Sequence, residues 1–210
     1  KQVGIGFEKF VFDDSAKQND IIGLVKKLKA DKKINGIIVQ LPLPSHLNTD
    51  LIISTIDVKK DVDGLHPENL GKLLIGESTI IPPTPAAVLE ILKSYQINLK
   101  GKHVVLVGYG KLVGKPLATM LALAEKDTTL TVCNKSTKKL SNFTKQADIL
   151  ISATGSAKLI TNDMIKKGAI IIDAGTTVIK PKTKDLKLKT KKGLRSSVFR
   201  PSLPSIMGDV

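Results

Sequence analysis

The chain has 210 residues, 41% of them hydrophobic, and a formal net charge of +14. This length and apolar content suit one large or two small packed domains. No apolar run approaches the roughly 20 residues of a membrane-spanning helix, and no secretory signal is visible, so we expect no membrane partner. The single cysteine, Cys133, excludes an internal disulfide framework and fits a reducing, cytoplasmic environment.

The first part of the chain alternates strand-like and helix-like segments. Residues 4–12 (GIGFEKFVF) begin like a half-buried strand, and residues 35–40 (NGIIVQ) are a short apolar run typical of a buried strand. Between them, residues 18–31 (QNDIIGLVKKLKAD) carry an apolar stripe at helical spacing. A second helix is predicted in residues 48–56 (NTDLIISTI), with Asn48 as its N-cap.

A Pro-Pro pair marks the predicted domain boundary. In residues 82–95 (PPTPAAVLEILKSY), Thr84 is a candidate N-cap and Pro85 a candidate first helical residue. We therefore predict two domains, residues 1–84 and residues 85–210.

The second part of the chain is more regular. Four short β-rich runs are separated by helical or loop material, and a helix is expected from about Val113. Strands that alternate with helices predict a parallel sheet with both faces covered. The fold class is therefore α/β: two α/β domains with a cleft between them, the second a Rossmann-like doubly wound parallel sheet. The four runs are HVVLV (103–107), TLTVC (129–133), DILIS (148–152) and AIIIDA (169–174).

Glycines follow the first of these runs in a pattern suited to a phosphate. Gly108, Tyr109 and Gly110, followed by Gly114, give G-x-G-x-x-x-G between a strand and a helix. Glycine permits a tight turn and a close backbone approach, and a helix N-terminus offers free N–H groups to an anion. The spacing is one residue longer than the usual dinucleotide fingerprint, so the alternative is a glycine-rich turn without a ligand. The surrounding strands favour a dinucleotide.

The end of the second strand indicates which dinucleotide. An NAD site usually carries an acid here for the ribose 2′-OH, but no acid follows Cys133. Donors and a cation stand there instead, which favours the 2′-phosphate of NADP over NAD. These residues are Asn134, Lys135, Ser136 and Thr137.

The segment Lys180–Arg200 has a local charge of +8. Such a segment is either a solvated loop or a nucleic-acid-binding arm. Aromatic residues make up only 3% of the chain, which leaves few platforms on which bases could stack. We therefore expect a solvated loop and no nucleic-acid partner.

Several motifs together resemble one family. GIIVQLPLP, KDVDGLHPENLGKL, IPPTPAAVLEIL, LKGKHVVLVGYGKLVGKPLATML and ADILISATGSAKLITNDMIKKGAIIIDAG occur in the order found in bifunctional methylenetetrahydrofolate dehydrogenase/cyclohydrolase, the FolD family. The similarity runs from Gly4 to Gly175. It implies NADP-dependent oxidation of 5,10-methylenetetrahydrofolate to the methenyl form and hydrolysis of that product to 10-formyltetrahydrofolate. It also implies tetrahydrofolate derivatives as partners, a homodimer and no metal ion.

The resemblance assigns roles residue by residue. Gln40 and Asp63 match catalytic positions, Gln40 by hydrogen bonding to a catalytic lysine and Asp63 by contacting the pterin ring. Asp61 is the alternative to Asp63, and either could instead form an Asx turn before Gly64. Substrate contacts are implied for Gln40, Leu41, Pro42 and Asp63. Cofactor contacts are implied for Gly108, Tyr109, Gly110, Val113, Gly114, Asn134, Lys135, Ser136, Thr137, Ala153, Thr154, Gly155 and Thr176.

The chain also departs from the family pattern. Tyr109 and Gly110 stand where the family usually has Arg or Ala and then Ser, so an Arg that can hold the 2′-phosphate is missing, and Lys135 would have to compensate. DAGTT stands where GIN is common, which would leave Thr176 to contact the nicotinamide half through its backbone. Lys60 and His66 are expected to be exposed loop residues.

The two ends raise a separate expectation. The family's Tyr-x-x-x-Lys motif would fall before Lys1, and its PVPGGVGP loop would follow the terminal MGDV. The chain therefore reads as an internal fragment that lacks the catalytic lysine. Two alternatives remain open: another Rossmann dehydrogenase of the shikimate or glutamyl-tRNA reductase kind, and a non-catalytic binding protein that keeps the fold.

Overall fold

The computed structural model describes residues 4–124, 127–175, 177–179 and 205–207. Thr176 and the basic segment of residues 180–200 therefore lie outside the described residues. The chain divides into two compact units, Lys1–Pro83 and Thr84–Val210, which are considered separately below. No helix in the described ranges is long and apolar enough to cross a membrane.

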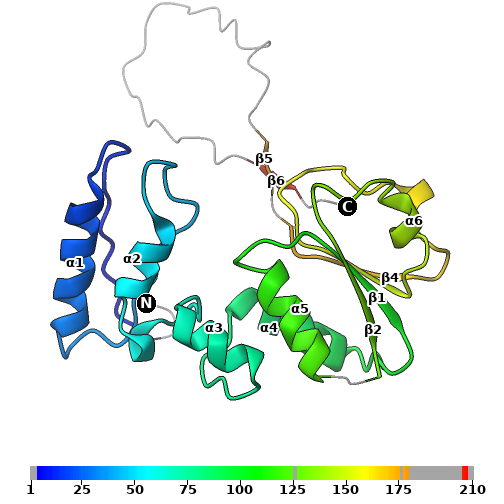
Figure 1. Ribbon diagram of the computed structural model, residues 1–210, viewed down its shortest axis with the longest axis horizontal. Helices are drawn as coiled ribbons and strands as arrows, with labels where there is room; N and C mark the ends of the chain where they lie inside the picture. Colours follow the sequence, from blue (N-terminus) through cyan, green and yellow to red (C-terminus); the bar gives the residue numbers. More distant parts are fainter. Residues whose placement is uncertain (1–3, 125–126, 176, 180–204, 208–210) are drawn as a thin grey trace, which may run out of the picture. The chain divides into compact units, whose positions relative to one another are not determined.

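The first unit is a small helical assembly. Its core contains Ile21 and Val25 from α1 and Ile52 from α2, and these two helices pack side by side (Figure 1). Asn48 caps α2 as predicted, because its side-chain oxygen accepts a hydrogen bond from the Leu51 N–H at 3.1 Å. The helices are α1 (Gln18–Ala30), α2 (Thr49–Thr55), the 3₁₀ helix η1 (Val58–Lys60) and α3 (Pro67–Leu74).

Neither strand predicted in this unit forms as expected. Residues 4–12 have no regular secondary structure, and Phe7 is 82% exposed. In residues 35–40 a single parallel bridge joins Ile37 to Asp61. Both predictions were wrong for the same reason: an apolar pattern makes a strand only where a second strand completes the ladder, and no strand in the described ranges pairs with either segment.

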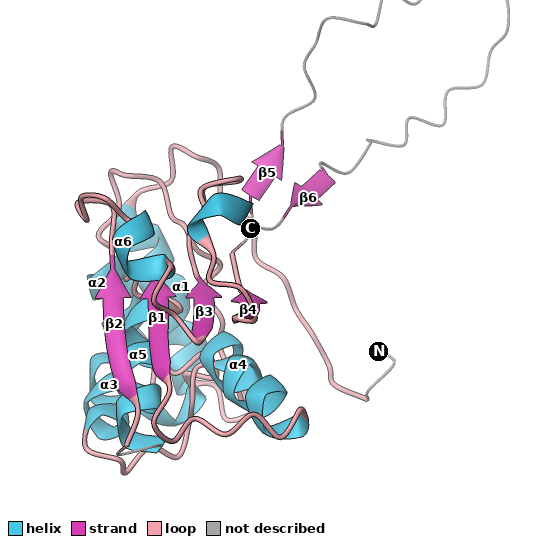
Figure 2. Cartoon of the chain, turned by 90° about the vertical axis from the view of Figure 1, so that its right-hand side faces the viewer, coloured by secondary structure: helices cyan, strands magenta, loops and turns pink. Residues whose placement is uncertain are grey.

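The second unit contains the predicted Rossmann-like sheet. Its four parallel strands lie in the order β2-β1-β3-β4 and point in one direction (Figure 2). Each predicted apolar run became one of these strands, and a further short antiparallel pair follows. The elements are α4 (Pro83–Ser94), β1 (His103–Val107), α5 (Gly114–Ala124), β2 (Thr129–Cys133), α6 (Ser141–Thr144), β3 (Ile149–Ser152), the 3₁₀ helix η2 (Asn162–Met164), β4 (Ile170–Asp173), β5 (Thr177–Ile179) and β6 (Ser205–Met207).

Both faces of the four-stranded sheet are covered, as a doubly wound fold requires. Val104 and Leu106 of β1 face a cluster with Leu92 of α4 and Leu117 of α5. Val105 and Val107 point to the opposite face, where residues around α6 and η2 cover them. The alternation explains why residues 104–107 of β1 are an unbroken apolar run, since each of these four side chains is buried in one of the two clusters.

The first helix of this unit begins earlier than predicted. The helix α4 starts at Pro83, so Thr84 is not its N-cap and Pro85 is the third helical residue. Both prolines are tolerated because the first N–H groups of a helix have no partner inside the helix.

Asp148 ties the amino ends of the strands together. Its Oδ2 accepts a hydrogen bond from the His103 N–H at 2.9 Å, and its Oδ1 accepts one from Lys166 Nζ at 2.6 Å. The His103 N–H, followed by the Lys166 ammonium, lowers the pKa of the Asp148 carboxyl from 3.8 to about 2. The charged form is therefore the one that the folded state stabilises.

Asp148→Asn is expected to lower the melting temperature near pH 7. Because the folded-state pKa lies below the unfolded value, the contribution of Asp148 is complete above about pH 4 and is lost as the pH falls toward about 2. Thermal unfolding followed by circular dichroism between pH 7 and pH 2 should show the two proteins converging at acid pH. Asp127→Asn, which removes the exposed ion pair with Lys100, serves as the control and should change little. A pH-independent difference for Asp148→Asn would contradict this account.

Candidate functional site

The order in which strands are added to the sheet reverses between β1 and β3. The chain passes from β1 through α5 to β2 on one side, and then returns to place β3 on the other side of β1. In open α/β sheets, ligands bind beyond the carboxyl ends of the strands at such a switch point. Here the switch point is formed by Gly108, directly after β1, and by Ala153 and Thr154, directly after β3. The Ala153 N–H donates to the Val107 carbonyl at 2.8 Å, which holds the two strand ends together.

Glycine is required at two positions of the turn after β1. Gly108 has φ of 107°, and a Cβ built there would lie 2.3 Å from the Ala153 carbonyl oxygen. A Cβ on Gly114, the first residue of α5, would lie 2.2 Å from the Gly108 carbonyl oxygen. Gly110 differs, because nothing lies within 4 Å of its Cβ position. The turn thus packs tightly against the protein at Gly108 and Gly114 and has free space at Gly110. Backbone N–H groups of such a turn, together with the N-terminus of α5, can bind a phosphate.

The side chains around this turn are aromatic and basic. Tyr109 is 47% exposed, and the Lys115 ammonium lies 5.6 Å from the centre of its ring, within cation–π range. Val113 is the last residue of the turn before α5. It is half-buried, and its carbonyl accepts a hydrogen bond from the Leu117 N–H at 2.9 Å. The cation beside Tyr109 adds to the positive end of the helix dipole.

The turn after β2 is held by its own side chains. The Asn134 N–H donates to Thr137 Oγ1, and the Ser136 N–H donates to Asn134 Oδ1, both at 2.9 Å. The Gly108 N–H donates to the Cys133 carbonyl at 2.9 Å, which places this turn beside the glycine turn. Asn134 and Thr137 therefore shape the turn, while Lys135 and Ser136 are exposed.

The residues that follow β3 are partly exposed to solvent. Ala153 and Thr154 are half-buried and Gly155 is exposed. The Ser156 N–H donates to Thr154 Oγ1 at 3.3 Å, which begins the turn away from the sheet. Gly108 and Ala153 thus lie together at the carboxyl ends of the two central strands, β1 and β3. Thr176 lies outside the described residues.

A second candidate site lies in the first unit, on the loop between η1 and α3. Asp61 is 1% exposed, and its Oδ2 accepts hydrogen bonds from the His66 N–H and from Asn69 Nδ2, both at 2.8 Å. The Gly64 N–H donates to the Asp61 carbonyl at 3.3 Å, which closes the loop into a turn. Asp61 is therefore a structural residue of this loop.

Lys60 and His66 are not the exposed loop residues that were expected. The half-buried Lys60 places its ammonium on the carbonyl oxygens of Lys29 and Asp31, both at 2.7 Å, where it caps the end of α1. His66 is the N-cap of α3, since its Nδ1 accepts from the Glu68 N–H at 3.1 Å. The loop is thus anchored at both of its ends.

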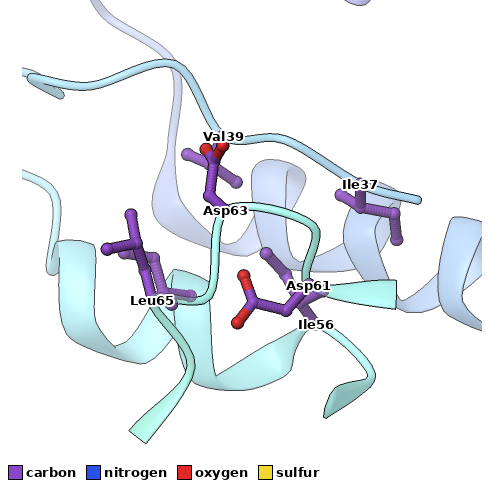
Figure 3. A pocket seen from close by; sticks show the side chains of 7 residues that line it. Ile37, Val39, Ile56, Asp61, Asp63 and Leu65 are labelled. Atoms are coloured by element: carbon purple, nitrogen blue, oxygen red, sulfur yellow. The ribbon is translucent and has the colours of Figure 1, made fainter. Parts of the chain in front are cut away.

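Asp63 is the carboxylate that this loop presents. Its side chain points toward Val39, while the Asp61 carboxylate points to the other side of the loop (Figure 3). Partial burial, followed by the charge of Asp61, raises the pKa of the Asp63 carboxyl. A partly buried carboxylate beside an apolar hollow can accept N–H groups from a flat heteroaromatic ring. The hollow is lined by Ile37, Val39, Ile53, Ile56, Asp61, Asp63 and Leu65.

The other predicted substrate residues lie on the segment after the Ile37 bridge. Gln40 is exposed, and its side-chain amide donates to the Leu41 carbonyl at 3.2 Å. Leu41 is half-buried and Pro42 is exposed, and the peptide bond between them is cis. Val39 of this segment lines the hollow next to Asp63. The segment therefore lies beside the loop of residues 61–66, called the acidic loop below.

Sequence reasoning missed Asn69 altogether. Its Nδ2 donates to the Val58 carbonyl at 3.0 Å as well as to Asp61, and its side chain is 2% exposed. The available signal was an asparagine inside a helix, a position that asparagine disfavours unless its side chain has partners there.

Comparisons with known proteins identify both units. The catalytic domain of tetrahydrofolate dehydrogenase/cyclohydrolase matches residues 1–63, and the NAD(P)-binding domain of the same family matches residues 82–193. A bifunctional protein FolD from Dehalococcoides mccartyi is 44% identical over 181 residues, which cover 85% of this chain and 61% of that protein. The chain thus spans about three fifths of the length of the curated relatives it matches.

Solved structures give the same answer. The bifunctional FolD enzyme from Campylobacter jejuni superposes with a TM-score of 0.77 at 39% identity, over 94% of this chain and 62% of that one. The FolD enzyme of Trypanosoma brucei, solved with NADP cofactor and an inhibitor, has a TM-score of 0.74 at 36% identity, over 79% of this chain and 57% of that one. With both domain models matched in order along the two units, the chain belongs to the tetrahydrofolate dehydrogenase/cyclohydrolase family.

Proposed function

We propose that the protein catalyses two consecutive steps of one-carbon metabolism. It oxidises 5,10-methylenetetrahydrofolate to 5,10-methenyltetrahydrofolate with NADP, and then hydrolyses the methenyl form to 10-formyltetrahydrofolate. The observation that carries this proposal is the order of the two family domains, each matched over the unit that holds the corresponding candidate site. A shikimate or glutamyl-tRNA reductase relationship would account for the glycine turn and leave the acidic loop unexplained.

In this proposal Asp63 holds the pterin. Its carboxylate, set against the apolar hollow, accepts hydrogen bonds from the ring N–H groups and fixes the one-carbon unit in place. Gln40 acts on the hydrolytic step by hydrogen bonding to the catalytic lysine that the family resemblance implies. In that step water adds to the methenyl carbon, one C–N bond opens, and a proton is released.

The second unit supplies the cofactor site. The residues fit a dinucleotide, because Gly108 and Gly114 leave room for no side chain and the turn is open at Gly110. When bound, NADP accepts the hydride that leaves the one-carbon unit. Gly108, Gly110 and the N-terminus of α5 would bind the pyrophosphate, and Lys135 and Lys115 would face negative charge on the ribose side. The exposed Tyr109 stands where the family usually has Arg or Ala.

Both activities can be measured on the protein expressed from its full reading frame. The dehydrogenase is followed by NADPH absorbance, and the cyclohydrolase by the loss of the methenyl chromophore. We expect both, at a shared folate site. A protein that binds NADP and has neither activity would refute the proposed function and favour a binding protein that keeps the fold.

Lys135→Glu is expected to erase or invert the preference for NADP. We expect the unaltered protein to bind NADP more tightly than NAD, since Lys135 attracts the 2′-phosphate and no acid competes for it. The carboxylate of the variant repels that phosphate, and a tenfold loss of NADP affinity corresponds to about 1.4 kcal/mol. Fluorescence titration with NADPH and NADH measures both affinities. Lys167→Glu, an equal charge change before β4 at the opposite edge of the sheet, should leave the preference intact. Equal affinities for both cofactors before mutation would count against the assignment.

We also propose a homodimer in the cytoplasm. The single cysteine suits a reducing compartment, and the dimer follows from the family resemblance. Sedimentation would measure the assembly state. No nucleic-acid partner is proposed, so retention on immobilised DNA should be absent at physiological salt.

A further inference from the structure

Two of the buried polar side chains in the first unit contact one another. The described ranges hold four buried polar or charged side chains, and Asp61 and Asn69 are two of them. They come from different elements, the loop after η1 and the helix α3, and they meet through a 2.8 Å hydrogen bond from Nδ2 to Oδ2. Burying a carboxylate and an amide costs free energy unless both are satisfied, so this contact calls for an explanation.

The contact joins three pieces of backbone at one point. Asn69 donates to the Val58 carbonyl of η1 as well as to Asp61, and Asp61 also accepts the His66 N–H at the start of α3. Two N–H donors therefore compensate the buried carboxylate. The loop between Asp61 and His66 is thereby held from both ends.

The tip of this loop has little freedom of its own. Gly64 has φ of 66°, and a Cβ there would lie 3.1 Å from Pro82 N and 3.2 Å from the Ile80 carbonyl oxygen. On the other side, the Ile37 N–H donates to the Lys60 carbonyl at 2.7 Å. The side chain that this fixed loop presents beside the hollow is Asp63 (Figure 3).

We infer that Asp61 and Asn69 are a positioning pair, which fixes the loop so that Asp63 meets the pterin in a single orientation. This inference rests on the proposed function, in which Asp63 binds the folate. In this inference both members of the positioning pair act through Asp63. Among the residues that line the hollow, Asp61 and Asp63 are the titratable ones, and the rest are Ile37, Val39, Ile53, Ile56 and Leu65.

The pair also has an electrostatic effect on Asp63. The charge of Asp61 is the second cause, after burial, of the raised pKa of the Asp63 carboxyl. Removing that charge while keeping a hydrogen-bond acceptor should therefore make Asp63 titrate at lower pH. The change would report that the loop holds the two carboxyl groups close together in the folded protein.

The first test breaks the pair. Asn69→Leu removes the amide at nearly constant volume. In the protein expressed from its full reading frame, we expect this change to raise the KM for methylenetetrahydrofolate at least tenfold and to leave the Kd for NADPH unchanged. Lys72→Ala, which removes an exposed ion pair with Glu68 on the same helix, is the matched control and should leave both values unchanged. A folded Asn69→Leu protein with an unaltered folate KM would overturn the inference.

The second test keeps the pair and removes its charge. Asp61→Asn retains an oxygen for the His66 and Asn69 donors, so we expect a folded protein whose Asp63 side-chain ¹³C signal titrates at lower pH without any ligand present. This measurement can be made even if Asn69→Leu does not fold, and an unshifted Asp63 titration would show that the loop does not hold the two carboxyl groups close together, which would overturn the inference. Asp63→Ala distinguishes failure of the proposed function from failure of the positioning pair. Unchanged folate binding in that variant refutes the proposed role of Asp63 itself. Weakened binding in Asp63→Ala together with unchanged binding in Asn69→Leu refutes the positioning pair alone.

Discussion

Gly108→Ala is expected to abolish binding of NADPH and to destabilise the second unit by about 3 kcal/mol or more. Two effects combine at this position. An L side chain is strained at φ of 107°, and its Cβ would lie 2.3 Å from the Ala153 carbonyl oxygen, so the end of β1 or of β3 has to move. That movement displaces the turn on which the pyrophosphate is proposed to lie. Urea unfolding and NADPH fluorescence titration measure the two consequences.

Gly110→Ala is the matched control for this prediction. It adds the same methyl group two residues later, where nothing lies within 4 Å of the new Cβ. Its free energy of unfolding should therefore stay within about 0.5 kcal/mol of the original, as for most exposed substitutions. Similar unfolding curves for the two variants would show that the close approach of Gly108 to Ala153 is not a constraint on the turn.

Asp63→Ala is expected to weaken folate binding and to depress both reactions. Truncation leaves the pterin N–H groups without an acceptor, a loss of about 1–3 kcal/mol, which corresponds to roughly 5- to 150-fold in affinity. Gln40→Ala should behave differently, because the exposed Gln40 amide is proposed to act on the catalytic lysine. It should lower the cyclohydrolase rate with a modest change in folate affinity.

The comparison of these two variants needs both assays on one preparation. NADPH absorbance reports the dehydrogenase and the methenyl chromophore reports the cyclohydrolase. If Asp63→Ala and Gln40→Ala lower the two rates in the same ratio, the proposed division of roles is wrong.

The second unit was predictable because its two central strands, β1 and β3, are buried on both faces. An unbroken apolar run such as residues 104–107 carries its own signal, and the glycines that follow it are demanded by backbone geometry within the same short stretch. Residues 4–12 were also predicted as a strand and remain exposed, because strand formation depends on a partner that the local sequence does not specify.

The anchors of the acidic loop could not be predicted for a related reason. Lys60 binds carbonyl groups about 30 residues earlier in the chain, at the end of α1, and its sequence neighbours give no indication of this. The preference for Asp63 over Asp61 came from a family resemblance. The structure adds a physical argument for it, since the Asp61 carboxylate already accepts two hydrogen bonds inside the protein.

Cys133 has a practical consequence for experiments in solution. It is the single cysteine of the sequence, its side chain is 1% exposed, and burial raises the pKa of its thiol. Maleimides react with accessible thiolates, so the native residue should remain unmodified under ordinary labelling conditions. A cysteine introduced at the exposed Ser136 could then carry one fluorophore without any removal of the native thiol. Such a label, beside Lys135, would report nucleotide exchange in real time.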